Sequence, residues 1–269
     1  MRLAGGPGIE EGDVVLIKPN AKNQSPPGYG IVTDPRVIEP IVEMAFHHGA
    51  DRVIIADGAA YPTGAYDTFA AFEAIGISDI AESWDVDLVD LNSHDSVDLD
   101  VSNGLTLDWV RVGRSVIEAD KVINVPVIKT HRGTFLSICV KNMGVGCATR
   151  EEKKRLHRLG INKALVDVYS LVKPSFNVVD GIVALEGDGP NLPPGEAKPL
   201  GLLLAGNDGV AVDAVCSSIM GFEPGNVEHL KLANQQGLGT INIDEIDIRG
   251  EKLERVITEF KPPSTFEVV

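Results

Sequence analysis

Lysine, histidine and aspartate side chains follow several apolar runs of this sequence, each at the point where a strand is expected to end. These residues are Lys18, Asn20, Asp57, Lys129, His131 and Asp180. In open α/β sheets, ligands bind outside the carboxyl ends of the strands. Residues at equivalent strand ends can therefore share one cavity, and we predict that this set forms a single polar site.

The lysines of this set predict that the site binds an anion. Ammonium groups bind phosphate or carboxylate as point charges, and Lys18 and Lys129 provide them in an acidic protein. Burial would lower the pKa of such a lysine and make it a base or a Schiff-base nucleophile. The alternative is a structural ion pair between a lysine and Asp57 or Asp180.

His131 is the best acid–base candidate among the six histidines. An unperturbed imidazole titrates near neutral pH, and a nearby ammonium would keep His131 neutral. Asp57 or Asp180 would orient the ring, bind a hydroxyl group or hold a metal. His157 belongs to the basic run 153–158, which either attracts an anionic ligand or is a solvated helix face.

The glycine-rich segment 141–146 adds candidate binding residues. It matches neither a P-loop nor a dinucleotide-binding fingerprint. Its backbone amides around Gly144 are nevertheless expected to be exposed and to cradle an anion, beside the side chains of Lys141 and Asn142.

The segment 186–199 is rich in proline and glycine and is expected to be a loop. It either acts as a lid that brings Glu186 to the site or is an ordinary surface excursion. A metal site is an alternative use of these side chains, although their spacing gives it no direct support. Its ligands would be His131, His157, Asp57, Asp180 and Glu186.

Composition excludes several classes of partner. The net charge of −15 gives a long-range field that repels nucleic acid and anionic membranes. The three cysteines include no CxxC pair, so we expect neither a disulfide framework nor an iron–sulfur cluster held by this chain. No apolar run has membrane-spanning length and no signal peptide is evident, so a cytoplasmic location is expected.

Apolar runs alternate with helical patterns along the chain. This alternation predicts an α/β fold with a mostly parallel (mixed) sheet and helices on its faces, in a single large domain over residues 1–269. The expected strands are 14–17, 52–56, 86–91, 105–112, 121–127, 176–179 and 200–205. Two helices are expected to begin after N-terminal caps, one at Thr33 or Asp34 and one at Asn207-Asp208. Further helices are expected over residues 68–75, 150–159, 161–172 and 227–236. Residues 261–269 are expected to form a loosely ordered tail.

Several stretches together resemble the proteins grouped as domain of unknown function family 362. They are Ile17–Asn20, Thr33–Arg36, Asp57-Gly58, Val125–His131, Lys141-Asn142, Val179–Pro190, Ala211–Ala214 and Met220-Gly221. Many proteins of this family carry, or lie beside, iron–sulfur ferredoxin segments, so the resemblance implies redox chemistry. Because this chain lacks a cluster-ligand cysteine run, any cluster would belong to a ferredoxin-like partner, and the resemblance identifies no cofactor.

The leading functional prediction is an enzyme that acts on a small anionic molecule. Lys18, Lys129 and Lys141 would hold the anion and His131 would move a proton. The reaction is then either proton transfer beside a carboxylate or electron delivery from the ferredoxin-like partner. The alternatives are a metal or metallocofactor protein and a non-catalytic module for ligand binding or electron transfer.

Overall fold

The computed structural model describes residues 2–59, 67–93, 95–190 and 195–266. The strands in these ranges are β1 Val14–Pro19, β2 Arg52–Asp57, β3 Asp87–Asp90, β4 Ser96–Asp100, β5 Trp109–Gly113, β6 Lys121–Val125, β7 Val127–His131, β8 Phe135–Leu136, β9 Phe176–Glu186 and β10 Glu196–Gly206. The α-helices are α1 Pro35–His47, α2 Thr68–Ile75, α3 Ile77–Trp84, α4 Arg114–Glu118, α5 Cys139–Gly146, α6 Arg150–Arg158, α7 Ile161–Leu171, α8 Gly209–Ile219, α9 Glu228–Gln235 and α10 Leu253–Val256. Short 3-10 helices cover Arg2–Ala4, Pro224–Asn226 and Ile243–Glu245.

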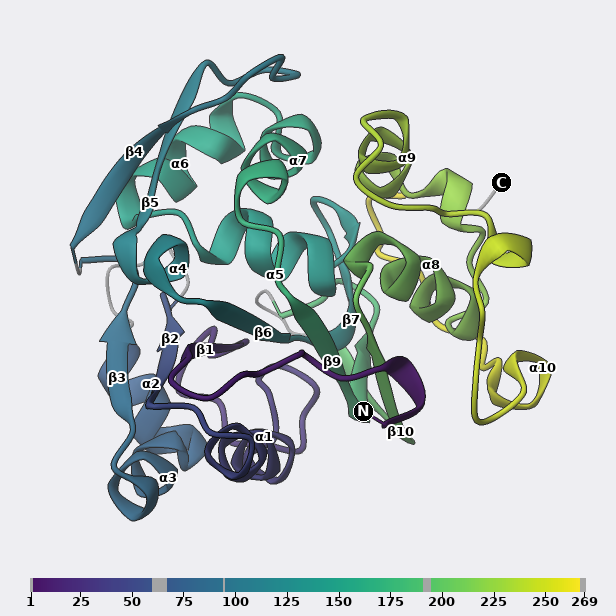
Figure 1. The fold of residues 1–269 in the computed structure, drawn as a ribbon. Coiled ribbons are helices and arrows are strands. Elements are labelled where there is room, and N and C mark those ends of the chain that lie inside the picture. The colour runs from purple at the N-terminus through teal and green to yellow at the C-terminus, as the bar shows by residue number, and fades with distance from the viewer. Residues whose placement is uncertain (1, 60–66, 94, 191–194, 267–269) are drawn as a thin grey trace.

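Eight of the strands form one sheet in the order β3-β2-β1-β6-β9-β7-β8, with β10 paired to β9 (Figure 1). The pairs from β3 to β9 are parallel, whereas β10 and β8 run antiparallel to their neighbours. β4 and β5 form a separate antiparallel hairpin. The predicted mostly parallel, mixed sheet of a single α/β domain is therefore confirmed.

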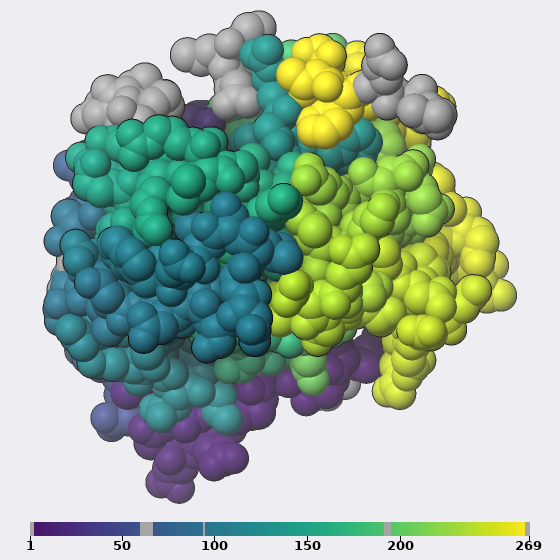
Figure 2. Space-filling model, turned by 90° about the horizontal axis from the view of Figure 1, so that it is seen from above, coloured from purple at the N-terminus to yellow at the C-terminus, as the bar shows by residue number. Residues whose placement is uncertain are grey.

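Helices cover both faces of the sheet and create two hydrophobic cores (Figure 1). Successive side chains of a strand point to opposite faces. Val15 and Ile17 of β1 accordingly pack in the same core as Ile38 of α1, whereas Leu16 packs in the same core as Leu165 of α7. The C-terminal part of the chain lies directly beside the α5–α7 region (Figure 2), where α8 contacts α5 and α9 contacts α7.

Helix caps were predictable from local sequence. Asp34 caps α1 and accepts a hydrogen bond from the Arg36 amide, and Asp208 caps α8 in the same way. Gly49 follows α1 with a φ of 95°, a left-handed conformation that favours glycine at the end of a helix.

Among the described residues, none of the helices has both the length and the apolar character that crossing a bilayer requires.

Two strand predictions differ from the structure because of a proline and of a neighbouring strand. The predicted strand 121–127 is two strands, because Pro126 has no N–H to donate and separates β6 from β7. The predicted strand 176–179 continues to Glu186, because β10 supplies antiparallel partners along the full length of β9. Asp180 therefore lies within β9 and not at its end.

A further strand and the loop before β10 also differ from the prediction. The predicted strand 105–112 forms only from Trp109, because the buried carboxylate of Asp167 accepts hydrogen bonds from the backbone amides of residues 105–107. The predicted loop 186–199 is shorter than expected, since β10 already begins at Glu196. Residues 191–194 of that loop lie outside the described residues. Neither β4 nor the helices α3 and α4 were expected.

The predicted tail begins at Lys261, and its described part contacts the body of the protein. The amide of Ser264 donates to Asp188 over 2.8 Å, and the Thr265 hydroxyl donates to the carbonyl of Arg132 over 2.6 Å. The ring of Phe266 packs edge-on against Phe135. Residues 267–269 lie outside the described residues.

The glycine-rich segment 141–146 is helical, which corrects the expectation of exposed amides at Gly144. The carboxylate of Asp213 on α8 accepts hydrogen bonds from the amides of Cys139 and Val140 and caps α5 from outside. Gly144 is buried where α5 crosses α7, and a Cβ there would lie 2.3 Å from the carbonyl oxygen of Leu165. Glycine at this position therefore permits close packing of two helices.

Replacing Gly144 with alanine tests this packing. Gly→Ala normally stabilises a helix interior, but here the new methyl must displace a backbone carbonyl. We expect G144A to lower the free energy of unfolding by about 1–3 kcal/mol, the usual cost of overpacking. G225A is the matched control, since a Cβ there would meet only the Glu223 carboxylate at 4.0 Å. Equal urea midpoints for the two variants would contradict the proposed contact.

Candidate functional site

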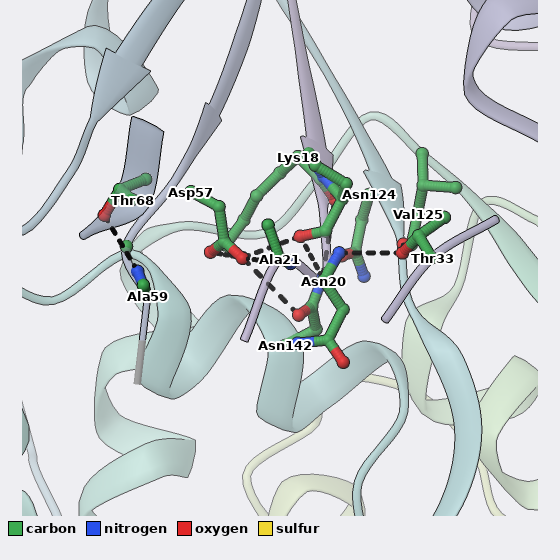
Figure 3. Close-up of polar contacts among 12 residues, drawn as sticks. Lys18, Asn20, Ala21, Thr33, Asp57, Ala59, Thr68, Asn124, Val125 and Asn142 are labelled. Carbon is green, nitrogen blue, oxygen red and sulfur yellow. Dashed lines mark hydrogen bonds and ion pairs between the residues drawn. The ribbon is translucent and has the colours of Figure 1, made fainter. Parts of the chain in front are cut away.

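A completely buried ion pair joins the carboxyl ends of β1 and β2 (Figure 3). The Lys18 ammonium donates to Asp57 Oδ1 over 2.7 Å and to the Pro19 carbonyl over 3.2 Å. The other carboxylate oxygen of Asp57 accepts the amide of Ala21 over 2.6 Å. A glycine at position 146 leaves room for the ammonium, because a Cβ there would lie 2.4 Å from Lys18 Nζ. For Lys18, the structure therefore matches the alternative of a structural ion pair.

Three asparagines extend this pair into a buried hydrogen-bonded row. Asn142 on α5 accepts from Lys18 over 3.4 Å and donates to Asn124 over 2.8 Å (Figure 3). Asn124 donates to Asn177 over 2.9 Å, and Asn177 donates to the Gly206 carbonyl over 3.1 Å. Lys18, Asn124 and Asn177 occupy paired positions of β1, β6 and β9. The side chains of this row hydrogen-bond to one another and to the backbone, and they form a rigid part of the site.

Asn124 and Asn177 were not predicted. Each is the single amide residue of its strand and is flanked by apolar residues on both sides, which is a signal that could have identified them. Buried polar side chains need partners, so an asparagine within each of two buried strands indicates that the strands are neighbours.

Lys129 of β7 is held by neutral oxygens. Its buried ammonium donates to the side-chain oxygen of Asn20 and to the carbonyl of Ile31, the latter over 2.8 Å. Burial lowers the pKa of Lys129 well below its usual value, and the positive charges of Lys141 and Lys22 lower it further. The charge of Lys129 is therefore not neutralised by a direct carboxylate partner.

Lys22 and Lys141 complete a group that we name the lysine cluster, consisting of Lys22, Lys129 and Lys141. Lys22 donates to the Pro190 carbonyl over 2.5 Å, and burial lowers its pKa to about 8. Burial and then the charge of Lys22 lower the pKa of Lys141 to about 7. Within the described ranges, the half-buried Lys141 ammonium makes no hydrogen bond and no ion pair. Lys22 was missed, although it lies only two residues beyond Asn20.

His131 lies next to the lysine cluster on β7. Its Nδ1 accepts the amide of Gly133 over 3.0 Å, which leaves the proton of the neutral ring on Nε2. Burial and then the charges of Lys141, Lys22 and Lys129 lower the pKa of His131 well below its usual value. The imidazole is consequently neutral near pH 7. In this tautomer Nε2 is a donor, and the ring can accept a proton only at Nδ1, once the Gly133 amide releases that atom.

The basic run 153–158 is divided between two environments. Lys153 is buried and donates to the Gly58 carbonyl over 3.0 Å and to Asn92 over 2.8 Å. His157 is exposed, and its Nδ1 contacts the carbonyl of Lys153 at 2.6 Å. The charge of His157 also lowers the pKa of His131, so His157 lies at the rim of the same region. The run is thus not one solvated face.

Asp180 has structural partners away from the lysine cluster. Its carboxylate accepts the amides of Asp34 over 2.8 Å and of Ile182 over 3.0 Å. Burial raises the pKa of Asp180 to about 6, although these two hydrogen bonds oppose the shift. The contacts fix the start of α1 on β9.

Glu186 also lies elsewhere, beside a hollow of about 270 Å³ at the ends of β9 and β10. Its carboxylate pairs with Lys198 over 2.8 Å and with Lys261 over 3.8 Å. Burial raises the pKa of Glu186, but these lysines outweigh the effect and the pKa is lowered. Gly144 is separate too, since it is packed against α7.

The described residues contain no group of three or more histidine, cysteine, aspartate or glutamate side chains that is placed to hold a metal ion. The three cysteines are buried and unpaired. Burial raises the pKa of the Cys147 thiol to about 12, so this thiol is not a ready nucleophile.

Comparisons with known proteins extend over most of the chain. A family model described as domain of unknown function (DUF362) matches residues 15–218. A thylakoid-associated protein of Synechocystis sp. is 27% identical over 264 residues, covering 95% of this chain and 78% of that protein.

Two solved structures are similar in fold. The lactate racemase apoprotein of Thermoanaerobacterium thermosaccharolyticum aligns with a TM-score of 0.52 and 13% identity over 80% of this chain. A protein of Thermotoga maritima aligns with a TM-score of 0.48 and 13% identity over 87% of this chain. The chain spans only 50% of the first structure and 57% of the second. At this identity, the racemase supports the α/β fold alone.

Removing the charge of Asp57 tests whether the ion pair is structural. D57N would leave the Lys18 ammonium buried without a counter-ion, and breaking a buried pair on one side costs about 3–5 kcal/mol. We expect this loss in the free energy of unfolding, measured by urea denaturation, and partial recovery in the double variant K18M/D57N. The control is R52A, which breaks the exposed Arg52–Asp87 pair and is expected to cost less than about 1 kcal/mol. A D57N variant as stable as R52A would refute the structural role.

Proposed function

The chain belongs to the DUF362 family, and we propose that its lysine cluster binds a small anionic substrate on which His131 acts as a proton-transfer group. The observation that carries the proposal is the half-buried Lys141 ammonium, which has no partner among the described residues. Its charge lowers the pKa of Lys129, and the charge of Lys22 lowers its own. Converging ammonium groups without carboxylates are costly unless an anion joins them.

Carboxylates near the site are already engaged. Asp57 is neutralised by Lys18, and Asp180 receives the backbone amide at the start of α1. Among the described residues, Lys22 and Lys129 are anchored by neutral oxygens. A carboxylate or phosphate group between the lysines would provide the missing negative charge, and its presence would raise the pKa values that burial and then the neighbouring charges have lowered.

The location within the sheet supports a ligand site. β2 follows β1 on one side and β6 lies on its other side, so the strand order reverses at β1. Ligands of open α/β sheets bind at the carboxyl ends of the strands where the order reverses. Lys22 follows β1 directly, and Lys129 reaches the loop after β1 through Asn20.

His131 provides the chemistry in this proposal. A neutral imidazole beside ammonium groups can remove a proton from a carbon or hydroxyl next to the bound anion, here at Nδ1 once the Gly133 amide releases it. The lysines would then stabilise the negative charge that develops. An electron-transfer reaction with a ferredoxin-like partner and a cytoplasmic location both stay predictions.

The pH dependence of anion binding tests the lysine cluster. Inorganic sulfate is a suitable probe, because its charge stays constant over the range used. Lysines are cationic below their pKa, so affinity should be highest near pH 6 and should fall as Lys141 and then Lys22 deprotonate between about pH 7 and 8. Isothermal titration calorimetry at pH 6 and pH 9 measures the change, and proton uptake on binding at pH 8 is expected. Affinity that rises toward pH 9 would contradict the proposal.

Substitution of Lys141 tests the same site directly. We expect K141A to weaken sulfate binding at pH 6 about tenfold or more, because a hydrogen bond to a charged group contributes roughly 1.5–3 kcal/mol. The matched control is K163A, which removes an exposed lysine from α7 and should leave binding unchanged. The proposal fails if both variants bind sulfate like the parent protein.

A further inference from the structure

We infer that the Lys141 amine is a nucleophile that forms an imine with a small carbonyl compound carrying a carboxylate or phosphate group. The inference rests on the proposed function, because the lysine cluster must first bind the anionic group. It names the class of substrate and gives Lys141 a covalent role.

The helix that carries Lys141 is fixed on both sides of this residue. Asp213 accepts hydrogen bonds from the amides of Cys139 and Val140, over 2.7 and 3.0 Å. The next residue, Asn142, is joined to Asn124 and to the backbone of β1. The backbone of Lys141 is therefore held firmly, whereas its ammonium has no partner in the described part of the chain. A lysine whose backbone is fixed and whose terminal amine has no partner is suited to attack a bound ligand.

The titratable side chains around Lys141 come from three other parts of the chain. Among the described residues, those with a resolved electrostatic interaction with Lys141 are lysines and histidines. Lys22 comes from the segment after β1, and both Lys129 and His131 come from β7. His229 of α9 is fully buried near Thr134, and neither of its nitrogens reaches hydrogen-bonding geometry. Burial lowers the pKa of His229 to about 3, so this ring is neutral and adds no charge.

The three lysines have different tasks in this arrangement. Lys22 and Lys129 are anchored by carbonyl and amide oxygens and would hold the anionic group of the substrate. Lys141 has a pKa of about 7, so about half of its amines carry a free lone pair at neutral pH. A lysine that is desolvated beside another cation is a known form of activated amine.

The chemical step conserves atoms and electrons. The amine lone pair forms a bond to the carbonyl carbon, and the carbonyl π electrons move to its oxygen. That oxygen leaves as water with the two protons that the amine loses, and an imine remains. His131 would take a proton from nitrogen at Nδ1, once the Gly133 amide releases that atom, and the resulting imidazolium would deliver a proton to the departing oxygen. Once protonated, the imine draws electrons from the neighbouring carbon, which favours proton removal there.

Reductive trapping tests the inference. The parent protein is incubated with pyruvate or with glyceraldehyde 3-phosphate, treated with sodium borohydride and digested for peptide mass spectrometry. We expect a reduced adduct on Lys141, with a rate of formation that is half-maximal near pH 7. The exposed Lys163 is the internal control and should react only at much higher pH. K141R keeps a positive charge but has no nucleophilic amine, so it should form no adduct at this position.

His131 provides a second readout. H131A should slow adduct formation at least about tenfold, the low end of general acid–base catalysis being on the order of a hundredfold, while sulfate still binds. Sulfate binding without any adduct on Lys141 from either carbonyl compound would overturn this inference and leave the proposed function standing. Adducts spread equally over exposed lysines would overturn it too. Absence of sulfate binding at pH 6 would overturn the proposed function itself.

Discussion

A buried ammonium must be neutralised, and the ion pair that meets this requirement for Lys18 determines how the rest of the site is arranged. Lys18 and Asp57 neutralise each other at the ends of two adjacent strands and leave no carboxylate free for the other lysines. Asn142, Asn124 and Asn177 continue the hydrogen bonding across the sheet without adding charge. In the part of the chain that the structure describes, Lys22, Lys129 and Lys141 then have no carboxylate in direct contact, inside a protein whose overall charge is strongly negative.

The elements whose signals are local agreed with the structure. Asp34 and Asp208 capped the expected helices, and the apolar runs at β1 and β2 formed the expected strands. Elements that depend on distant partners were mispredicted. Residues 105–107 are not a strand because Asp167, some sixty positions away, binds their amides. β9 is longer than predicted because β10 pairs along its full length.

The same distinction applies to the candidate site. Strand-end reasoning placed Lys18, Asp57, Lys129 and His131 in one region, because parallel strands bring their carboxyl ends to one edge. The sequence left open whether Lys18 would bind an anion or form an ion pair with Asp57, and the structure shows the ion pair. It placed Asp180 and Glu186 in the site, whereas their contacts are to α1 and to Lys198. Burial depth, which distinguishes Lys153 from its exposed helix neighbours, also depends on packing that no local pattern encodes.

The external cap of α5 has a consequence for how the protein folds. The segment 141–146 contains an asparagine and two glycines and has little tendency to be helical by itself. Its first turn is completed by Asp213, which lies 74 positions from Cys139 along the chain. This cap can form only after α8 has packed against α5. Partial opening of α8 would therefore remove the cap and disorganise the helix that carries Lys141, while most of the β-structure persists.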